Sequence, residues 1–247
     1  MPNIAIIIPA RLASVRFPNK PLVDILGEKM IIRVCKQAAK SQYSDIFVAC
    51  SEEETKNILE EAGFKAIMTD PNLPSGTDRI YAAYQEIKNE KNYDIIVNLQ
   101  GDLPNIEPEI INQTVKVLEL DAKADIATAV VELDYDSELA DDPNVVKAIV
   151  NFNHSKHNNV LYFSRAKVPH NTPILYEHLG LYAYRIKALE EFVKLDVSYF
   201  EKYEKLEQLR ALENGLKISA CLITDHKAPI AIDTKSDLER LLKILKD

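Results

Sequence analysis

Short apolar runs alternate along the chain with longer segments in which apolar residues recur every three or four positions. The runs have the length of buried strands, and four of them cover residues 4–8, 46–49, 65–68 and 95–99. The longer segments carry the period of an α-helix, as in the stripe formed by Ile31, Val34, Cys35 and Ala38. Strands that alternate with helices are typical of βαβ units. We therefore predict an α/β fold with a mainly parallel central sheet and helices on both of its faces.

The middle of the chain has a different character, with extended runs at residues 145–150, 160–163 and 179–184. A leucine-rich stripe after these runs predicts one further helix, which Gly215 would end in a left-handed conformation. The members of this stripe are Tyr203, Leu206, Leu209, Leu212 and Leu216. No repeat, linker or low-complexity stretch interrupts the 247 residues. We predict a single domain over residues 1–247 with a smaller strand-rich subregion at about residues 133–216.

The composition narrows the class of partner. The chain has 38 acidic and 30 basic residues and a formal net charge of -8, which argues against a broad nucleic-acid surface. We find no basic leader, and no apolar run approaches the roughly 18 residues of a membrane span. The three cysteines lie far apart in apolar stretches, as is typical of a reducing compartment. We expect a cytoplasmic protein that binds small molecules.

The ligand of an open parallel sheet lies at the carboxyl ends of its strands, so the loop after the first run is examined first. It carries Arg11, Arg16 and Lys20 together with three prolines, and it lacks the G-x-G-x-x-G pattern of dinucleotide sites. Arginine forks and a lysine point charge suit the oxygens of a triphosphate. The alternative is a solvated basic loop, which three cations at this position make less favourable.

A second polar segment covers residues 72–79. We predict that Thr77 caps a helix beginning at Asp78, and that Ser75 and Gly76 offer hydroxyl and backbone groups to a base edge. Arg79 then falls in the first helical turn, where the helix dipole disfavours a cation by about 0.3 to 1 kcal/mol. An anionic ligand would explain that placement, whereas the alternative is an exposed arginine beside Asp78.

Two aspartates follow apolar stretches and suggest a metal site. The run at residues 95–99 leads into Gln100, Gly101 and Asp102, and Asp233 follows the stretch 228–232, which we interpret as another strand. Mg²⁺ takes one or two carboxylates together with phosphate oxygens, so this pair opposite a cationic loop predicts magnesium. Alternatively, Asp102 is a turn residue and Asp233 caps the next helix, in which Ser236 and Glu239 have the spacing of a capping box.

Residues 178–184 alternate with the period of a strand. His178, Gly180, Tyr182 and Tyr184 would share one face, and the leucines and Ala183 would share the other. A glycine between two ring side chains leaves room for a ligand, and these rings are good partners for sugar hydroxyls or a carboxylate. An ordinary half-buried strand explains the pattern equally well.

These motifs, in this order, resemble the 3-deoxy-manno-octulosonate (Kdo) cytidylyltransferases, or CMP-Kdo synthetases, of bacterial lipopolysaccharide assembly. The resemblance covers nearly the whole chain. It rests on residues 8–22, 75–79, 98–102, 162–166, 178–182, 206–210 and 232–234.

The resemblance implies a fold like that of nucleotide-sugar transferases (GT-A-like) and a homodimer built partly through the middle subregion. It implies that CMP passes from CTP to the anomeric hydroxyl of Kdo and that pyrophosphate leaves. Catalytic roles would fall to Arg11, Lys20, Asp102 and Asp233, the last two as magnesium ligands. The nucleotide would contact Arg11, Arg16, Lys20, Ser75, Gly76, Thr77, Arg79 and Gln100. The sugar acid would contact Gln100, Arg165, His178, Tyr182, Glu207 and Gln208.

Three other functions compete with this one, and an 8-amino relative of Kdo stays open as the substrate. A synthetase of activated sialate would have similar chemistry, but its first loop is typically richer in glycine than residues 12–15. A glycosyltransferase of related fold would carry an Asp-x-Asp motif, which residues 101–103 do not supply. A non-catalytic nucleotide sensor would have no need of both Asp102 and Asp233.

Overall fold

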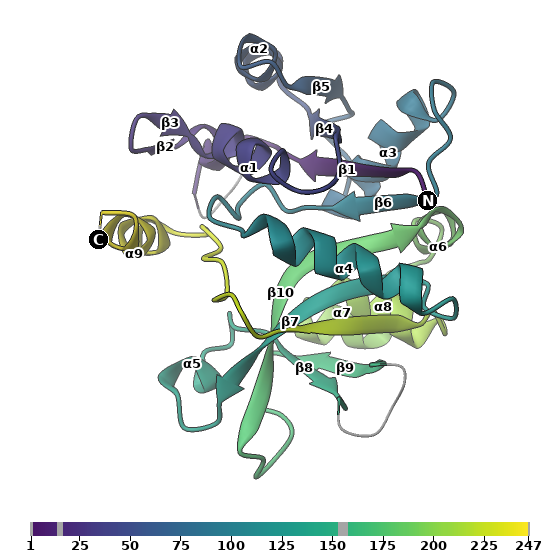
Figure 1. Cartoon of the computed structure of the whole chain (residues 1–247), viewed down its shortest axis with the longest axis vertical. Helices are drawn as coiled ribbons and strands as arrows, with labels where there is room; N and C mark the ends of the chain where they lie inside the picture. Colours follow the sequence, from purple (N-terminus) through teal and green to yellow (C-terminus); the bar gives the residue numbers. More distant parts are fainter. Residues whose placement is uncertain (1, 14–16, 153–157, 247) are drawn as a thin grey trace. The chain divides into compact units, whose positions relative to one another are not determined.

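The computed structural model describes residues 2–13, 17–152 and 158–246, which fall into two compact units (Figure 1). Unit 1 comprises Met1–Ile111 and Ala228–Asp247, and unit 2 comprises Asn112–Lys227. The predicted strand-rich subregion lies inside unit 2. The division into two units does not test whether the chain is a single domain, so the single domain over residues 1–247 stays a prediction.

Unit 1 is built on a parallel sheet in the strand order β6, β1, β4, β5. Its strands are β1 (Ile4–Pro9), β4 (Asp45–Cys50), β5 (Lys65–Met68) and β6 (Ile95–Asn98). All four coincide with predicted runs to within one residue at each end. Ile6 pairs in register with Ile46 and Val97, and the β1 isoleucines Ile6, Ile7 and Ile8 are fully buried. Burial on both faces explains why this strand is continuously apolar.

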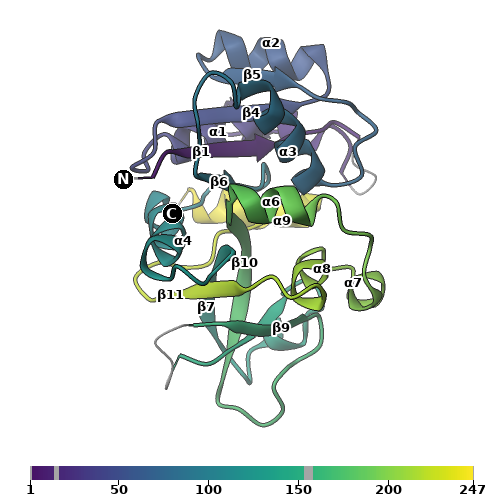
Figure 2. The same cartoon turned by 90° about the vertical axis from the view of Figure 1, so that its right-hand side faces the viewer.

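The helices of unit 1 connect these strands. They are α1 (Met30–Ala38), α2 (Glu53–Glu61) and α3 (Gly76–Ile87), with α9 (Lys235–Ile244) near the end of the chain. A short 3-10 helix η1 (Lys20–Leu22) and a hairpin of β2 (Asp24–Ile25) and β3 (Glu28–Lys29) precede α1. Figure 2 shows α2 beside β4 and β5, against which it packs. The α/β fold with a mainly parallel central sheet is therefore confirmed.

The last segment of unit 1 returns from unit 2 and packs on the region around the hairpin. Ile230, Ile232 and Leu241 form one buried cluster with Ile25 and Met30. The stretch 228–232 is not a strand, contrary to the prediction. It makes isolated hydrogen bonds instead of a ladder, from Ile230 N to Asn105 Oδ1 (2.9 Å) and from Ile232 N to Asp102 O (3.0 Å).

The N-cap of the helix after this stretch lies two residues before Ser236, the first residue of the predicted capping box. Thr234 is the N-cap of α9, and its box partner is Asp237, so the pairing of Ser236 with Glu239 is wrong. Thr234 and Asp237 have the same spacing, and a threonine also accepts from the third backbone N–H of a helix. Asp233 therefore lies just before the cap and is not itself the capping residue.

Unit 2 contains a mixed sheet in the order β11, β7, β10, with β8 pairing with β10 and β9. Strands β11 and β7 run parallel, whereas the pairs β10 with β7, β10 with β8 and β8 with β9 are antiparallel. The strands are β7 (Ile126–Asp134), β8 (Lys147–Val150), β9 (Val160–Ser164), β10 (Ile174–Arg185) and β11 (Ile218–Ile223). The helices are α5 (Glu138–Asp141), α6 (Ile186–Phe192), α7 (Tyr199–Glu204) and α8 (Gln208–Glu213), and α4 (Pro108–Leu120) crosses the division between the units.

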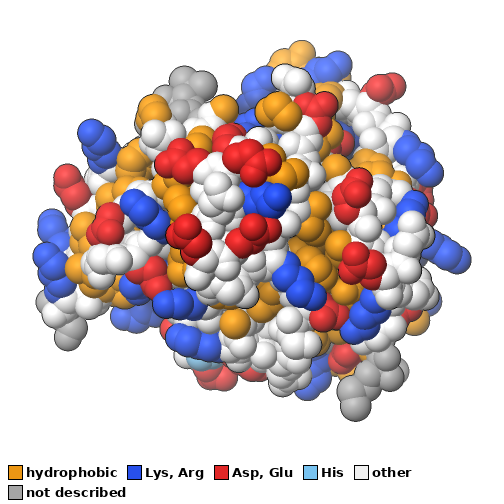
Figure 3. All heavy atoms as spheres, turned by 90° about the horizontal axis from the view of Figure 1, so that it is seen from above, with side chains coloured by type: hydrophobic (Ala, Val, Ile, Leu, Met, Phe, Trp, Pro, Cys, Tyr) orange, Lys and Arg blue, Asp and Glu red, His pale blue; other side chains and the backbone are white. Residues whose placement is uncertain are grey.

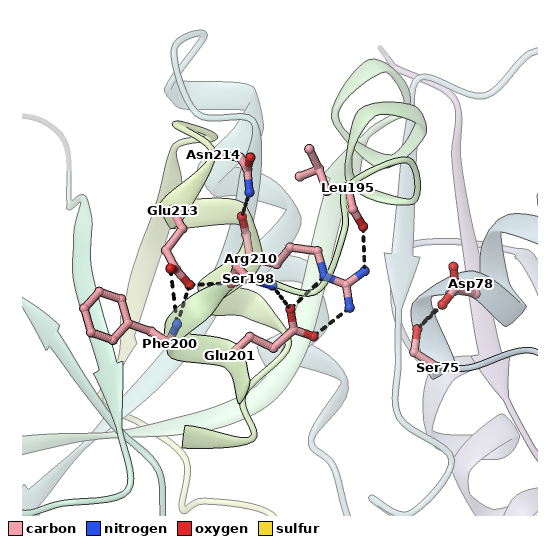
Figure 4. Close-up of polar contacts among 9 residues, drawn as sticks. All are labelled: Ser75, Asp78, Leu195, Ser198, Phe200, Glu201, Arg210, Glu213 and Asn214. Carbon is pink, nitrogen blue, oxygen red and sulfur yellow. Dashed lines mark hydrogen bonds and ion pairs between the residues drawn. The ribbon is translucent and has the colours of Figure 1, made fainter. Parts of the chain in front are cut away.

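The predicted long helix through residues 203–216 is two short helices. Lys205 adopts a left-handed conformation (φ 56°) and ends α7, after which α8 folds back. The Arg210 guanidinium donates to both carboxylate oxygens of Glu201, at 2.9 and 2.6 Å, and this buried pair fastens the two helices together (Figure 4). Glu213 accepts from the backbone N–H of Phe200 at the start of α7. Gly215 follows α8 at φ 83°, as predicted.

The surface in Figure 3 carries acidic and basic side chains close to one another. This face therefore offers mixed charge and not the single positive sign that suits nucleic acid. Within the described ranges, no helix has both the length and the hydropathy that crossing a membrane requires.

Candidate functional site

A cavity of about 400 Å³ lies in unit 1, at the carboxyl ends of β1 and β6. Because neighbouring parallel strands end at the same edge of a sheet, the loops after them face one space. The predicted nucleotide residues Arg11, Lys20, Ser75, Gly76, Arg79 and Gln100 and both predicted metal ligands line it. Among the described residues, the lining consists of Pro9, Ala10, Arg11, Ala13, Lys20, Pro21, Ser75, Gly76, Arg79, Gln100, Gly101, Asp102 and Asp233.

Lys20 joins the two aspartates. Its ammonium donates to Asp102 Oδ2 at 2.8 Å and to Asp233 Oδ1 at 2.9 Å. The side chains are 16%, 23% and 40% exposed, in the order Lys20, Asp102 and Asp233, so the carboxylate pair faces the cavity opening. Burial alone would lower the pKa of Lys20, but attraction to Asp102 and Asp233 and their hydrogen bonds outweigh it and raise the pKa. Lys20 is therefore a fully charged counter-ion.

The backbone fixes where Asp102 sits. A Cβ on Gly101 would lie 2.7 Å from the carbonyl oxygen of Pro9, so only glycine lets the loop after β6 pass this close to the end of β1. The carbonyl of Asp102 then accepts from Ile232 N at 3.0 Å, which brings the next residue, Asp233, alongside. Close packing and one backbone hydrogen bond thus place the carboxylate pair.

Two arginines add positive charge to the cavity. Arg11 is exposed, whereas Arg79 is only 2% exposed, which excludes the exposed-arginine interpretation. Arg79 Nη1 donates to Thr69 Oγ1 at 2.6 Å, while its buried Nη2 has no hydrogen-bond partner among the described residues. Burial lowers the pKa of Arg79, and the positive charge of Arg11 adds to that effect. Neighbouring cations and an unmatched donor make this side of the cavity suited to an anion.

The start of α3 differs from the prediction in its cap. Ser75, not Thr77, is the N-cap: its hydroxyl accepts from Asp78 N at 3.1 Å and donates to Asp78 Oδ2 at 2.7 Å (Figure 4). Thr77 lies in the first turn, is buried and does not line the cavity. Ser75 and Thr77 both qualify as capping residues by type, and the serine is chosen because the helix begins at Gly76.

A buried amide supports Gln100 from behind. Gln100 Nε2 donates to Asn98 Oδ1 at 2.9 Å, and Asn98 Nδ2 donates to Thr77 Oγ1 at 3.4 Å. The prediction did not single out Asn98, although a polar residue at the end of an apolar strand was a usable signal. Arg16 lies outside the described residues.

Two predicted sugar residues, His178 and Tyr182, belong to a chain of aromatic rings in unit 2. The centroids of His178 and Tyr182 are 5.2 Å apart, and those of Tyr182 and Tyr184 are 5.9 Å apart. These three therefore share a face, as predicted. A register shift between His178 and Tyr182, where Gly180 has φ 68°, interrupts the simple alternation. From His178 to Tyr182, β10 advances four residues while β7 advances two, so β10 carries two extra residues. Because two is an even number, the rings before and after the shift lie on the same side of the strand.

Thr128 orients the imidazole. Its hydroxyl donates to Leu181 O at 2.7 Å and lies 2.9 Å from His178 Nε2. Because the single hydroxyl proton goes to the carbonyl, Nε2 carries the imidazole proton and Nδ1 is left as an acceptor. Burial lowers the pKa of His178 to about 3, so the ring is neutral at physiological pH. Thr128 was missed because β7 was not predicted.

Arg165 makes contacts that the sequence did not suggest. Its guanidinium donates to three backbone carbonyls: Glu204 O (2.6 Å), Pro143 O (2.8 Å) and Lys205 O (3.3 Å). The buried Lys147 ammonium holds Asp142 O and Val145 O in the same loop. Two cations thus fasten the loop before β8, and Arg165 also fastens the junction of α7 and α8.

Glu207 and Gln208 follow that junction directly. Glu207 is the N-cap residue of α8, and Gln208 is its first residue and is 8% exposed. Burial raises the pKa of Tyr182 well above its usual value, and the charges of Tyr184 and Glu207 add to this, so Glu207 belongs to the same polar cluster as the rings. Unit 2 therefore brings together Tyr182, His178 and Glu207, whereas Gln100 belongs to unit 1.

In the described part of the chain, no group of three or more His, Cys, Asp or Glu side chains is arranged to hold a metal ion. A metal on Asp102 and Asp233 would take its other ligands from water and substrate, as Mg²⁺ commonly does.

Comparison with known proteins decides the family. A family model described as cytidylyltransferase matches residues 5–218. A relative from Paramagnetospirillum magneticum, named 3-deoxy-manno-octulosonate cytidylyltransferase, is 45% identical over 98% of this chain and 97% of its own. The chain belongs to the 3-deoxy-manno-octulosonate cytidylyltransferase family.

Further members of this family agree. A relative of the same name from Brucella anthropi is 46% identical and covers 95% of this chain and 93% of its own. A solved structure of CMP:2-keto-3-deoxy-manno-octonic acid synthetase complexed with CTP is 32% identical, has a TM-score of 0.88, and covers 98% of both chains. The cytidylyltransferase family predicted from the motifs is confirmed.

Proposed function

We propose that this protein transfers CMP from CTP to the anomeric hydroxyl of Kdo, giving CMP-Kdo and pyrophosphate. The observation that carries the proposal is the unit 1 cavity, in which Arg11, Arg79 and Lys20 lie with the carboxylates of Asp102 and Asp233. Three cations match a triphosphate, and a carboxylate pair matches the metal that accompanies one. Membership of the family named for this reaction supports the choice of substrates.

The nucleotide would lie in this cavity. Arg11 and Lys20 would bind phosphate oxygens, and the unmatched Nη2 of Arg79 would gain an acceptor. Gly76 has no side chain, and a Cβ there would meet Gln100 Oε1 at 3.7 Å, so glycine keeps space beside that amide. Ser75 and Gln100 would contact the nucleoside, while Thr77 would support them from outside the lining.

Magnesium fits the donor set of the site. Asp102 and Asp233 approach one ammonium to within 2.9 Å, so both carboxylates can reach a single cation. Hard oxygen donors and a partly open side are what Mg²⁺ prefers. When bound there, the ion would neutralise phosphate charge and lower the pKa of the attacking hydroxyl.

The reaction needs no covalent intermediate with the protein. The anomeric oxygen would form a bond to the α-phosphorus while the bond to the bridging oxygen of pyrophosphate breaks in line with it, and the hydroxyl proton would pass to solvent. Arg11 and Lys20 would hold the phosphates in that alignment. Catalysis of such transfers rests mostly on positioning and charge neutralisation.

The sugar acid would be recognised by unit 2. His178 Nδ1 would accept a hydrogen bond from a sugar hydroxyl, because Nε2 is committed to Thr128. Tyr182, Glu207 and Gln208 would supply further polar groups. Arg165 has five donors, of which three go to backbone carbonyls, so only the rest of its fork would contact a carboxylate.

Pyrophosphate release tests the proposed reaction. The purified protein would be incubated with CTP, Mg²⁺ and each member of a sugar-acid panel that contains Kdo, 8-amino-Kdo and sialate. We expect release with Kdo and the highest kcat/KM for it. Preference for 8-amino-Kdo would revise the substrate, and preference for sialate would favour the activated-sialate alternative. Nucleotide binding without release would indicate a sensor.

We further propose a cytoplasmic homodimer that serves lipopolysaccharide biosynthesis. Unit 2 exposes apolar side chains at and just before α7, namely Val197, Tyr199, Phe200 and Tyr203, each at least 45% exposed. Adjacent rings there pack edge to face, with 5.3 Å between the ring centroids of Tyr199 and Phe200. Exposed patches of this kind mark association surfaces. Light scattering at several protein concentrations tests the dimer, and a mass that stays monomeric would contradict it.

A further inference from the structure

Lys20 has two roles that compete for one ammonium. Its Nζ bridges Asp102 and Asp233, yet the proposed function also places Lys20 on the phosphates of CTP. An ammonium has three N–H donors, and the two carboxylates take two of them. The cation that joins the carboxylates is therefore in the place where a metal shared by them would lie.

Electrostatics favours an exchange between these roles. Two carboxylates that face each other closely repel unless a cation lies between them. In this structure Lys20 supplies that cation. A triphosphate entering the cavity brings several negative charges past the same carboxylates. Moving the ammonium onto the phosphates would offset their charge and would leave the carboxylates for a divalent cation.

The side chain can make this move without a change in the backbone. Lys20 is the first residue of η1, which packs through the buried Pro21, and the hydrogen bonds Leu22 N to Asn19 O (2.9 Å) and Val23 N to Lys20 O (3.2 Å) hold the turn. Four rotatable side-chain bonds separate this fixed backbone from Nζ. The ammonium lines the cavity together with Arg11, which the proposed function also assigns to phosphate.

We propose that Lys20 is an exchangeable counter-ion: it holds the carboxylate pair while the nucleotide is absent and leaves it for the phosphates when CTP binds. The protein without nucleotide then binds divalent cations weakly, and nucleotide strengthens that binding. By linkage, the metal strengthens nucleotide binding by the same factor. This proposal rests on the proposed function, because it assumes that Asp102 and Asp233 hold the metal.

The test measures binding of Mn²⁺, a paramagnetic substitute for Mg²⁺, to the nucleotide-free protein by electron paramagnetic resonance. Lys20→Met removes the ammonium and keeps the length of the side chain. We expect Lys20→Met to bind one Mn²⁺ at least about tenfold more tightly than the wild type, the scale of a typical coupling between sites. Lys20→Arg keeps the charge and should stay close to the wild type.

Two controls isolate the effect. Lys36→Met removes another lysine of unit 1, which pairs with Glu28 at the surface, and should leave Mn²⁺ affinity unchanged. Adding Asp102→Asn to Lys20→Met should abolish the tight Mn²⁺ site. Thermal unfolding checks that each variant is folded, and Lys20→Gln replaces Lys20→Met if the latter is not.

A second arm adds α,β-methylene-CTP, which cannot release pyrophosphate, and subtracts the Mn²⁺ bound by the same nucleotide without protein. The analogue should raise the Mn²⁺ affinity of the wild type and have a smaller effect on Lys20→Met.

The outcomes separate the two proposals. In one outcome, Asp102→Asn abolishes Mn²⁺ binding in the nucleotide complex, but the nucleotide-free wild type and Lys20→Met bind Mn²⁺ equally well. This outcome would overturn the proposal that Lys20 is an exchangeable counter-ion. If Asp102→Asn leaves binding intact in every form, the carboxylate pair is not the metal site, and the counter-ion falls with it. Absence of pyrophosphate release from CTP and any sugar acid would instead contradict the proposed reaction.

Discussion

The unit 1 cavity and the arginines of unit 2 use charged side chains in opposite ways. In unit 1, Lys20, Asp102 and Asp233 compensate one another at a solvent-accessible opening, at 2.8 and 2.9 Å. In unit 2, Arg165 ends on backbone carbonyls and Arg210 on the buried carboxylate of Glu201. The first arrangement can exchange partners with a ligand, whereas the second holds loops and helices in place.

This difference shows that an arginine in a motif is not sufficient to identify a ligand-binding group. A charge whose partners are other side chains at an opening can be redirected when substrate arrives. A charge that bonds several backbone carbonyls at once is costly to redirect, because those carbonyls would lose their shared donor. Substitutions in unit 1 should therefore change activity before stability, and substitutions of the unit 2 arginines should change stability as well.

The largest expected effect is on the carboxylates. Asp102→Asn or Asp233→Asn should lower kcat by at least about 100-fold, since a metal ion in such a site supplies several kcal/mol of charge stabilisation. The free energy of unfolding should change little, because the carbonyl of Asp102 keeps its hydrogen bond from Ile232. Pyrophosphate release and urea unfolding measure the two quantities. Near-wild-type turnover in either variant would remove the metal assignment.

The cations of the cavity come next. Arg11→Ala and Lys20→Ala should each lower kcat/KM for CTP by about 10- to 100-fold, because a hydrogen bond to a charged group contributes about 1.5 to 3 kcal/mol. Arg33→Ala is a suitable control, since Arg33 is a unit 1 arginine that does not line the cavity. If kcat/KM for CTP is unchanged in both variants, the loop after β1 is a solvated basic loop and not a phosphate site.

Arg165→Ala should combine both kinds of effect. We expect the free energy of unfolding to fall by about 1.5 to 3 kcal/mol as three carbonyls lose a charged donor. We also expect KM for Kdo to rise far more than KM for CTP, because the predicted sugar residues Glu207 and Gln208 directly follow the junction that Arg165 fastens. Chemical denaturation and a two-substrate kinetic matrix give the two results.

Arg185→Ala is the matched control for this variant. Arg185 is also a unit 2 arginine that donates to backbone carbonyls, those of Leu118, Ala124 and Asp121. Its loss should cost similar stability without a selective rise in KM for Kdo. If Arg165→Ala is as stable as the wild type and has a high KM for Kdo, Arg165 binds the sugar acid and does not stabilise the loops. The contrast drawn between the two units would then be wrong.

The smallest effect concerns His178 and pH. The folded ring has a pKa of about 3 against 6.5 for the ordinary side chain, so the unfolded chain binds a proton first as the pH falls. Its stabilising contribution is complete above pH 6.5 and is lost as the pH falls toward 3, by at most about 1.4 kcal/mol per pH unit. His178→Phe should lack this dependence, and it should raise KM for Kdo less than Arg165→Ala does.

Unfolding in urea at pH 7, 6, 5 and 4 measures the difference between wild type and His178→Phe. Parallel curves for the two proteins would mean that the ring takes up its proton over the same pH range in the folded and unfolded chains, and the lowered pKa of His178 would then be wrong.

The sequence predicts the parallel sheet of unit 1 well because β1, β4 and β6 are buried on both faces and helices separate the strands. β5 (Lys65–Met68) has the predicted bounds, and β1 extends the predicted run by one residue. Each of these runs is short and lies between segments of different pattern, so local composition is enough to find it. The proximity of Lys20 and Asp102 also follows, since they come after the neighbouring parallel strands β1 and β6. Asp233 does not follow from this rule, because residues 228–232 before it are not a strand.

Other features depend on contacts between distant residues and leave little trace in the sequence. The break between α7 and α8 occurs at Lys205, a lysine in a left-handed conformation, where sequence rules look for glycine. The Glu201–Arg210 pair and the bonds from Arg165 to the carbonyls of the junction stabilise that break. The strands β7 and β11 were missed for a related reason, because a short apolar run beside a helix does not reveal its own period.

The chain path through unit 1 has a consequence for synthesis of the protein. Lys20 and Asp102 are translated before any of unit 2, whereas Asp233 emerges from the ribosome only after residues 112–227. A nascent chain can therefore form the parallel sheet and the cationic loop while it still lacks one of the two carboxylates. Turnover of CTP would begin only once the returning segment has closed on Asp102, so incomplete chains would be unable to consume the nucleotide.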